Sequence, residues 1–195
     1  MKTSDVLSAD QGLRGGDGGR ENGGETGAWR EFRAAARALS GPIGTGAALS
    51  LGVMTGFFFA FSNPTMMGFK AVDAETYIAA MQAINVAVRN LPFFIAFAAP
   101  LPLALLAALI GRPRWPWLAA AVCYAAAVAV TRAVNSPIND AMALGNPAAP
   151  PENWAEIRDR WTDANHLRGV LAGLGATLAL IGVRRAGDKR RQRSG

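Results

Sequence analysis

Four long apolar segments alternate with polar stretches along this chain. They cover residues 43–62, 91–110, 116–134 and 166–183. Each is close to the roughly 20 residues that an α-helix needs to cross the hydrocarbon core of a bilayer. The helices of a soluble bundle would carry polar residues at every turn, and these segments do not. The pattern therefore predicts an all-α protein whose main body is a four-transmembrane-helix bundle, with the lipid bilayer as its first partner.

The stretch before the first apolar segment divides into two parts. Residues 1–28 are rich in glycine and polar side chains, a composition typical of disorder because it cannot bury a core. From residue 29 to residue 39, apolar side chains recur at helical spacing and arginines fall between them. We expect a short basic amphipathic helix there, lying on the membrane surface. Gly41-Pro42 marks the expected boundary before the first span.

These patterns divide the chain into an N-terminal tail (1–40), a membrane domain (41–184) and a basic C-terminal tail (185–195). Short extra helices are predicted in the long loops of the membrane domain. One covers about 74–90, and another begins near Trp154 and runs into the fourth span.

Small residues four positions apart occur in the first and last apolar segments. They are Gly52 with Gly56, and Gly169 with Gly173. Such pairs let membrane helices approach closely, since lipid offers no hydrophobic drive for their association. We expect the first and fourth segments to pack together. The alternative is that these glycines mediate self-association, which would make the protein a homo-oligomer.

The distribution of charge predicts an orientation in the cell membrane. The net charge is +6, and the basic residues concentrate in the two tails and in the loop 111–115. The loop 135–165 is net acidic. By the positive-inside rule both termini are cytoplasmic, and the loops 63–90 and 135–165 lie on the outer face. Because the basic residues lie where this rule puts them, we expect no nucleic-acid partner.

Polar side chains gather at the predicted outer ends of the spans. Polar groups are costly near a bilayer, so a functional site is the first hypothesis there. Other interpretations stay open, since amides at helix ends also satisfy backbone groups, a tryptophan is common at the membrane interface, and a histidine can simply bond at a helix start. The candidates are Gln82, Asn85, Asn135, Asn139, Trp161, Asn165, His166 and Arg168.

Two arginines, Arg132 and Arg168, flank the same outer boundary, and Asp140 and Asp163 are their expected partners. The chain has one histidine and one cysteine, and Cys123 lies inside the third apolar segment. We therefore expect no zinc or haem site, and no phosphate-binding glycine motif is present either. The prediction is a site without a metal or an organic cofactor.

Four motifs together resemble the anthrone oxygenase family, a group of small four-span membrane proteins also catalogued as a domain of unknown function. The resemblance covers about residues 43–183 and leaves the first forty unmatched. The motifs are Gly-Phe-Phe-Phe-Ala-Phe with Asn63-Pro64, Met81-Gln82-Ala-Ile84-Asn85, Asn135-Ser-Pro137-Ile-Asn139 and Trp161-x-x-x-Asn165-His166-Leu-Arg168.

The resemblance implies a cofactor-independent oxidation of a tricyclic anthrone to an anthraquinone by molecular oxygen. On this hypothesis His166 is the catalytic base, because its ordinary pKa lies near neutrality. Asn165, Asn139 and Gln82 would donate hydrogen bonds to the developing oxyanion. Trp161 would stack on the small hydrophobic aromatic substrate. The remaining candidates for contacting the substrate are Asn85, Asn135 and Arg168.

Two other functions fit the same residues. The polar cluster would only hold the bundle together in a non-catalytic accessory or scaffold protein of the membrane. It would bind without turnover in a lipid- or quinone-binding module.

Overall fold

The computed structural model describes residues 21–194, which divide into two compact units with the boundary between Ala36 and Arg37. All regular elements in the described part are helices, which confirms the all-α prediction. The disorder that we predict for 1–28 falls mostly outside the described residues, but 21–28 belong to helix α1 (Glu21–Ala60). Residues 29–39, predicted as a short separate helix, are helical as part of α1, and the Trp29 and Phe32 rings meet edge to face at 5.9 Å.

Four helical stretches among the described residues are long and apolar enough to cross a membrane, as the sequence predicted. They are Gly27–Phe69, Leu91–Ile110, Trp115–Leu144 and Trp154–Asp188. The last belongs to one uninterrupted helix, α8 (Trp154–Ser194), so the predicted loop helix does run into the fourth span. The same helix continues through the segment that we expected to be a basic tail.

The other three stretches are built from shorter elements. The first combines α1, a π-helical turn η1 (Phe61–Thr65) and α2 (Met66–Phe69). The second combines α4 (Leu91–Ala98) with α5 (Pro100–Ile110). The third combines α6 (Trp115–Val130), a second π-helical turn η2 (Thr131–Asn135) and α7 (Ser136–Leu144). A short helix, α3 (Ala74–Ala87), lies between the first and second stretches along the chain.

Two prolines, Pro42 and Pro64, lie inside helical elements without ending the helical stretch. The helix is not interrupted at the predicted boundary Gly41-Pro42, because α1 continues through Pro42. Pro64 cannot donate to the Ala60 carbonyl one turn earlier, and the Thr65 hydroxyl donates to that oxygen at 3.0 Å instead. The helix widens into η1 and goes on, so it does not end at residue 62 as we expected. A proline removes one hydrogen bond, and tertiary packing supplies most of the stability of such helices.

One face of α8 packs against the rest of the bundle in alternating steps of three and four residues. All seven residues of this face are buried: Trp161, Asn165, Arg168, Ala172, Gly175, Ala179 and Gly182. The spacing keeps them on one side of the helix. At one end of the face, the ring of Trp117 fills the space beside Gly182 and Gly44, and a Cβ at either glycine would come within 2.7 Å of it.

The expected packing between the first and fourth stretches is present, but only the α8 glycines take part. A Cβ on Gly169 would meet Phe58 at 3.6 Å, and one on Gly173 would meet Thr55 at 3.4 Å. Gly52 and Gly56 face open space on α1. Of these two pairs of glycines, only the pair on α8 therefore lies at the contact between the two helices.

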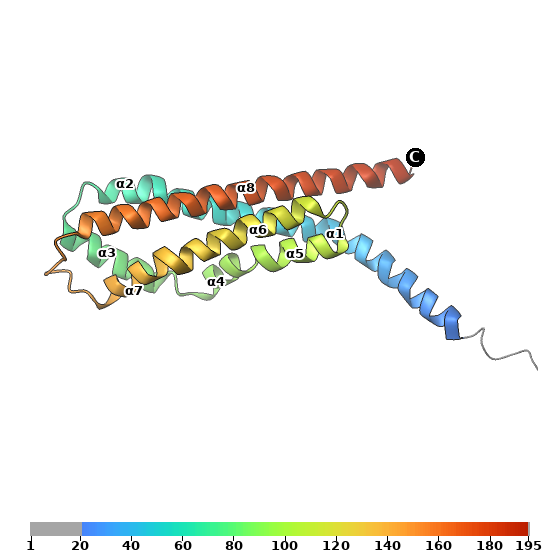
Figure 1. Ribbon diagram of the computed structural model, residues 1–195, viewed down its shortest axis with the longest axis horizontal. Coiled ribbons are helices and arrows are strands. Elements are labelled where there is room, and N and C mark those ends of the chain that lie inside the picture. The colour runs from blue at the N-terminus through green and yellow to red at the C-terminus, as the bar shows by residue number, and fades with distance from the viewer. Residues whose placement is uncertain (1–20, 195) are drawn as a thin grey trace, which may run out of the picture. The chain divides into compact units, whose positions relative to one another are not determined.

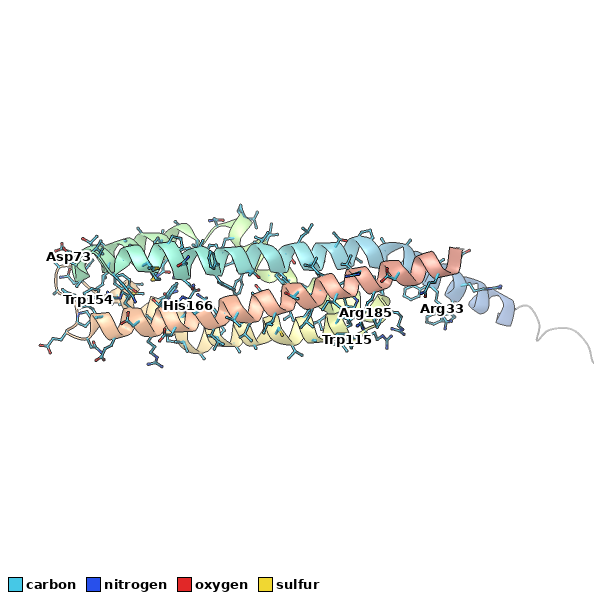
Figure 2. The ribbon with its side chains drawn as sticks, turned by 90° about the horizontal axis from the view of Figure 1, so that it is seen from above. Arg33, Asp73, Trp115, Trp154, His166 and Arg185 are labelled. Atoms are coloured by element: carbon cyan, nitrogen blue, oxygen red, sulfur yellow. The ribbon has the colours of Figure 1, made fainter. Side chains whose placement is uncertain are left out.

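Within the second unit, α2, α3, α7 and the start of α8 gather at one end of the bundle (Figure 1). We call this the α3/α7 end. The connection between α5 and α6 lies at the other end, where Trp115 and Arg185 are also found (Figure 2). The Arg185 guanidinium lies 5.1 Å from the centre of the Trp115 ring.

Local capping sets the bounds of the helices at the α3/α7 end. The Asp73 carboxylate accepts a hydrogen bond from the Thr76 N–H at 2.8 Å, which begins α3 and lowers the pKa of Asp73. Asn90 likewise accepts from the Phe93 N–H at 2.9 Å and begins α4. Because Asn90 caps the following helix, α3 ends at Ala87, three residues before the predicted end.

Candidate active site

A buried arginine lies at the centre of the polar cluster that the sequence pointed to. Arg168 is only 6% exposed. Its Nη1 donates to the Thr131 hydroxyl at 3.2 Å, and its Nη2 donates to the Asn165 side-chain oxygen. The guanidinium also lies over two rings, 4.6 Å from the centre of Phe58 and 5.5 Å from that of Trp161. Neutral groups and aromatic faces thus surround this charge.

Asn165 connects the arginine to the first apolar helix. It is fully buried, and its Nδ2 donates to the Phe58 carbonyl at 2.9 Å and to the Ser62 hydroxyl at 2.6 Å. Its side-chain oxygen is thereby turned toward Arg168. The widened turn η1 brings Ser62 into this position, where it is 4% exposed. Asn165 therefore positions Arg168.

A second set of hydrogen bonds fixes Trp161. Its indole N–H donates to the Asn139 side-chain oxygen at 2.8 Å, and its carbonyl accepts from Asn135 Nδ2 at 3.1 Å. Asn135 is 1% exposed and lies in the second π-helical turn, η2. Both π-helical turns thus contribute a buried polar residue to the site, and such turns are common at functional sites.

A cavity of about 500 Å³ opens beside these groups, lined by residues of α1, η1, α3, α4, α6, η2, α7 and α8. Its volume falls in the range typical of small-molecule sites. Six phenylalanines form a large part of its apolar wall: Phe57, Phe58, Phe61, Phe93, Phe94 and Phe97. Its polar lining consists of Asn85, Thr131, Arg132, Ser136, Asn139 and Arg168, with Trp161 beside them.

Two of the lining residues have buried hydrogen-bond donors without a partner. They are Arg168 Nε and Asn85 Nδ2. Buried polar groups in proteins are nearly always bonded, so each such exception calls for an explanation. A ligand with acceptor oxygens in the cavity would supply it.

The predicted ion pairs of Arg132 and Arg168 with Asp140 and Asp163 are not formed. Arg132, Asp140 and Asp163 are all exposed. Elsewhere on α8, the Arg158 guanidinium pairs with the carboxylate of Asp159 at 3.0 Å. The reason is geometric: Arg168 faces the interior of the bundle, whereas both aspartates project from its surface.

His166 lies apart from the buried cluster. It is exposed on α8, toward the α3/α7 end, and it does not line the cavity (Figure 2). One residue along an α-helix is a rotation of about 100°, so the burial of Asn165 turns His166 outward. The structure brings Asn165, Arg168, Trp161, Asn139 and Asn135 together and leaves His166 out.

Gln82 has a different environment from the one that we expected. Its Nε2 donates to the carbonyls of Met142 at 2.7 Å and Gly145 at 2.9 Å. These bonds attach α3 to the end of α7, and Gln82 does not line the cavity. Asn85, three residues later on α3, does line it.

A comparison with known protein families shows to which family the chain belongs. The model of the anthrone oxygenase family matches residues 80–178, just over half of the chain. The chain belongs to this family. No curated protein matches. No solved structure matches either.

The part shared with the anthrone oxygenase family runs from α3 into α8. It includes Asn85, Thr131, Asn139, Trp161 and Arg168, so it supplies the polar lining of the cavity. The phenylalanines of α1 and η1 lie outside the matched range and complete the wall.

Sequence reasoning missed several members of this site. Ser62 and Thr131 look like ordinary helix hydroxyls, and only the packing shows their bonds to Asn165 and Arg168. A usable signal did exist for the orientation of α8. The small residues Ala172, Gly175 and Ala179 continue the spacing of Asn165 and Arg168, which marks the packed face and excludes His166 from it.

Among the described residues, no group of three or more His, Cys, Asp or Glu side chains comes close enough to hold a metal ion.

Proposed function

We propose that this protein is an integral membrane oxygenase that converts an anthrone-like polycyclic aromatic ketone to a quinone with molecular oxygen. The observation that supports this best is the cavity itself. Its wall of phenylalanines suits a flat apolar ring system, and the buried Arg168 supplies positive charge where an oxyanion would develop. Membership of the anthrone oxygenase family agrees with this chemistry.

The reaction balances with the substrate and oxygen alone. The methylene opposite the ketone loses a proton to water, which leaves an electron-rich enolate. The enolate transfers electrons to oxygen, and a carbon–oxygen bond forms at the former methylene to give a hydroperoxide after protonation. Loss of water, with removal of the remaining hydrogen on that carbon, gives the second carbonyl. Oxygen is the oxidant and the substrate is the reductant.

The residues of the cavity have distinct roles in this proposal. Arg168 and Asn85 donate hydrogen bonds to the negatively charged oxygen of the enolate, through the two donors that lack partners. Trp161, held by Asn139, lies against the flat substrate. Asn165 is a positioning residue that acts through Arg168. Preorganised donors of this kind stabilise a transition state because they need no reorganisation during the reaction.

We also propose an orientation in the cell membrane, with both termini cytoplasmic and the α3/α7 end outside. The basic residues of both tails and of the loop 111–115 support it. Reporter proteins fused to the C-terminus and inserted at residue 147 test it. The C-terminal fusion should report a cytoplasmic location and the insertion an outer one, and the reverse pattern would contradict the orientation.

Oxygen uptake by the purified protein tests the function. Wild-type protein in lipid nanodiscs should consume oxygen and form quinone when a model anthrone is added, faster than empty nanodiscs. Equal amounts of oxygen consumed and quinone formed are expected from the stoichiometry above. A rate no higher than that of empty nanodiscs, with several anthrones, would favour the scaffold or the binding module.

A further inference from the structure

We infer that the cavity selects organic anions: its ligand is an aromatic ring system with an ionised oxygen, a phenolate, enolate or carboxylate, bound to Arg168. This inference rests on the proposed function for the identity of the site as the substrate cavity. It goes further by naming the charge state in which the ligand is recognised.

The first argument is charge balance. A guanidinium stays ionised in proteins, so Arg168 places a full positive charge among buried groups. Its hydrogen-bond partners, Thr131 and Asn165, are neutral. A buried charge at membrane depth is costly unless an opposite charge compensates it. The cavity beside Arg168 is where an anionic ligand would provide that compensation.

The second argument is the set of donors that remain free. Arg168 uses Nη1 and Nη2 within the protein, and its Nε is buried without a partner. Asn85 lines the same cavity from α3, and its Nδ2 is also buried without a partner. Both residues are at least nine-tenths buried, at 6% and 9% exposed. Two free donors from different helices suit an oxygen that carries negative charge.

The third argument is the absence of a base in the wall. The described residues that line the cavity include no Asp, Glu, His, Cys, Tyr or Lys. No lining side chain can therefore take a proton from a neutral ligand. Binding of an already ionised ligand removes the need for such a group.

A matched pair of fluorescent ligands tests this inference directly. Anthracene-9-carboxylate and the neutral 9-anthracenemethanol have the same ring system, and neither has the acidic methylene that oxidation requires. Wild-type protein in nanodiscs of neutral lipid should bind the carboxylate roughly ten- to a hundredfold more tightly than the alcohol, as expected for a charge-assisted hydrogen bond. Equal affinities for the two ligands would overturn the inference.

Variants identify the residue that causes the preference for the carboxylate. Arg168→Gln should lose the preference for the carboxylate while still binding the alcohol, which shows that the cavity is intact. Arg89→Gln removes an exposed charge outside the cavity and should keep the preference. If Arg168→Gln keeps the preference and Arg132→Gln abolishes it, the exposed arginine at the cavity is responsible and the inference is wrong. Should Arg168→Gln fail to accumulate, Asn85→Leu should weaken carboxylate binding more than alcohol binding, and an equal effect on both would count against the inference.

The two proposals fail in different ways. Selective carboxylate binding without anthrone oxidation would support the anion site and contradict the proposed oxygenase function. Anthrone oxidation without selectivity between the two ligands would support the oxygenase function and contradict the anion site.

Discussion

The guanidinium carbon of Arg168 lies 4.6 Å from the centre of the Phe58 ring, and Asn165 donates to the carbonyl of the same phenylalanine. Two residues of α8, one turn apart, thus contact the ring and the backbone of a single residue of α1. This arrangement joins the two helices where the cavity begins. It also holds the charge of Arg168 against an aromatic face, which compensates only part of the cost of burying it.

Replacement of Arg168 should remove most of the catalytic activity. We expect Arg168→Gln to lower kcat for anthrone oxidation by roughly a hundredfold, the effect typical of losing one oxyanion donor. Arg168→Lys keeps the charge but loses the fork of donors, so it should recover part of the rate. Oxygen uptake and quinone absorbance measure both variants.

His166→Ala is the control for this prediction, since His166 lies on the same helix but is exposed. It should retain the wild-type rate and pH profile. A folded His166→Ala protein that loses activity would restore histidine as the base and contradict the assignment to the cavity.

Replacement of Asn165 should lower the stability of the protein more than replacement of its neighbour His166. Asn165→Ala leaves the Ser62 hydroxyl, the Phe58 carbonyl and Arg168 Nη2 each short of one buried hydrogen bond. We expect the free energy of unfolding to fall by about 1–3 kcal/mol. His166→Ala should change it by less than about 0.5 kcal/mol, as for most surface substitutions. Denaturant titration in detergent measures both, and equal effects would contradict the buried position of Asn165.

A methyl group at residue 182 should disturb the opposite end of the bundle. A Cβ on Gly182 would lie 2.6 Å from the Trp117 ring, which is buried and cannot move aside easily. Gly182→Ala should therefore lower the free energy of unfolding by about 1–3 kcal/mol. Gly52→Ala is the matched control, because its Cβ meets nothing within 4 Å. That variant should unfold no earlier than wild type, since alanine favours the helix.

The hydroxyl of Tyr77 should ionise at an unusually high pH. Burial raises the pKa of its hydroxyl from 10.0 to about 12, and the nearby Arg158 opposes this rise only in part. In the unfolded chain the same hydroxyl ionises near pH 10, so its contribution to stability is complete below that pH and is lost as pH rises toward 12. The difference between the phenolate absorbance curves of wild type and Tyr77→Phe isolates this group. A midpoint near pH 10 in the folded protein would show that the hydroxyl is hydrated.

Much of the architecture could be predicted because it depends on local pattern. The length and composition of the apolar segments indicated four helices able to span a membrane, and four helices of sufficient length and apolar character are present in the described part of the chain. The face of α8 that packs against the bundle could also have been predicted, since its small residues mark that face. The continuation of helices through Pro42 and Pro64 was not, because a local rule for proline does not include the packing of the turns that follow.

By itself, the sequence determined that this is a helical membrane protein with its polar motifs at one end, because hydrophobic length and helical period are properties of neighbouring residues. Only the tertiary structure decided which polar residues form the site. Arg168 lies beside Thr131, not beside Asp140 or Asp163, and it lines a cavity whose other lining residues come largely from other helices. Such relationships depend on how helices rotate and pack against one another, and no single segment carries that information.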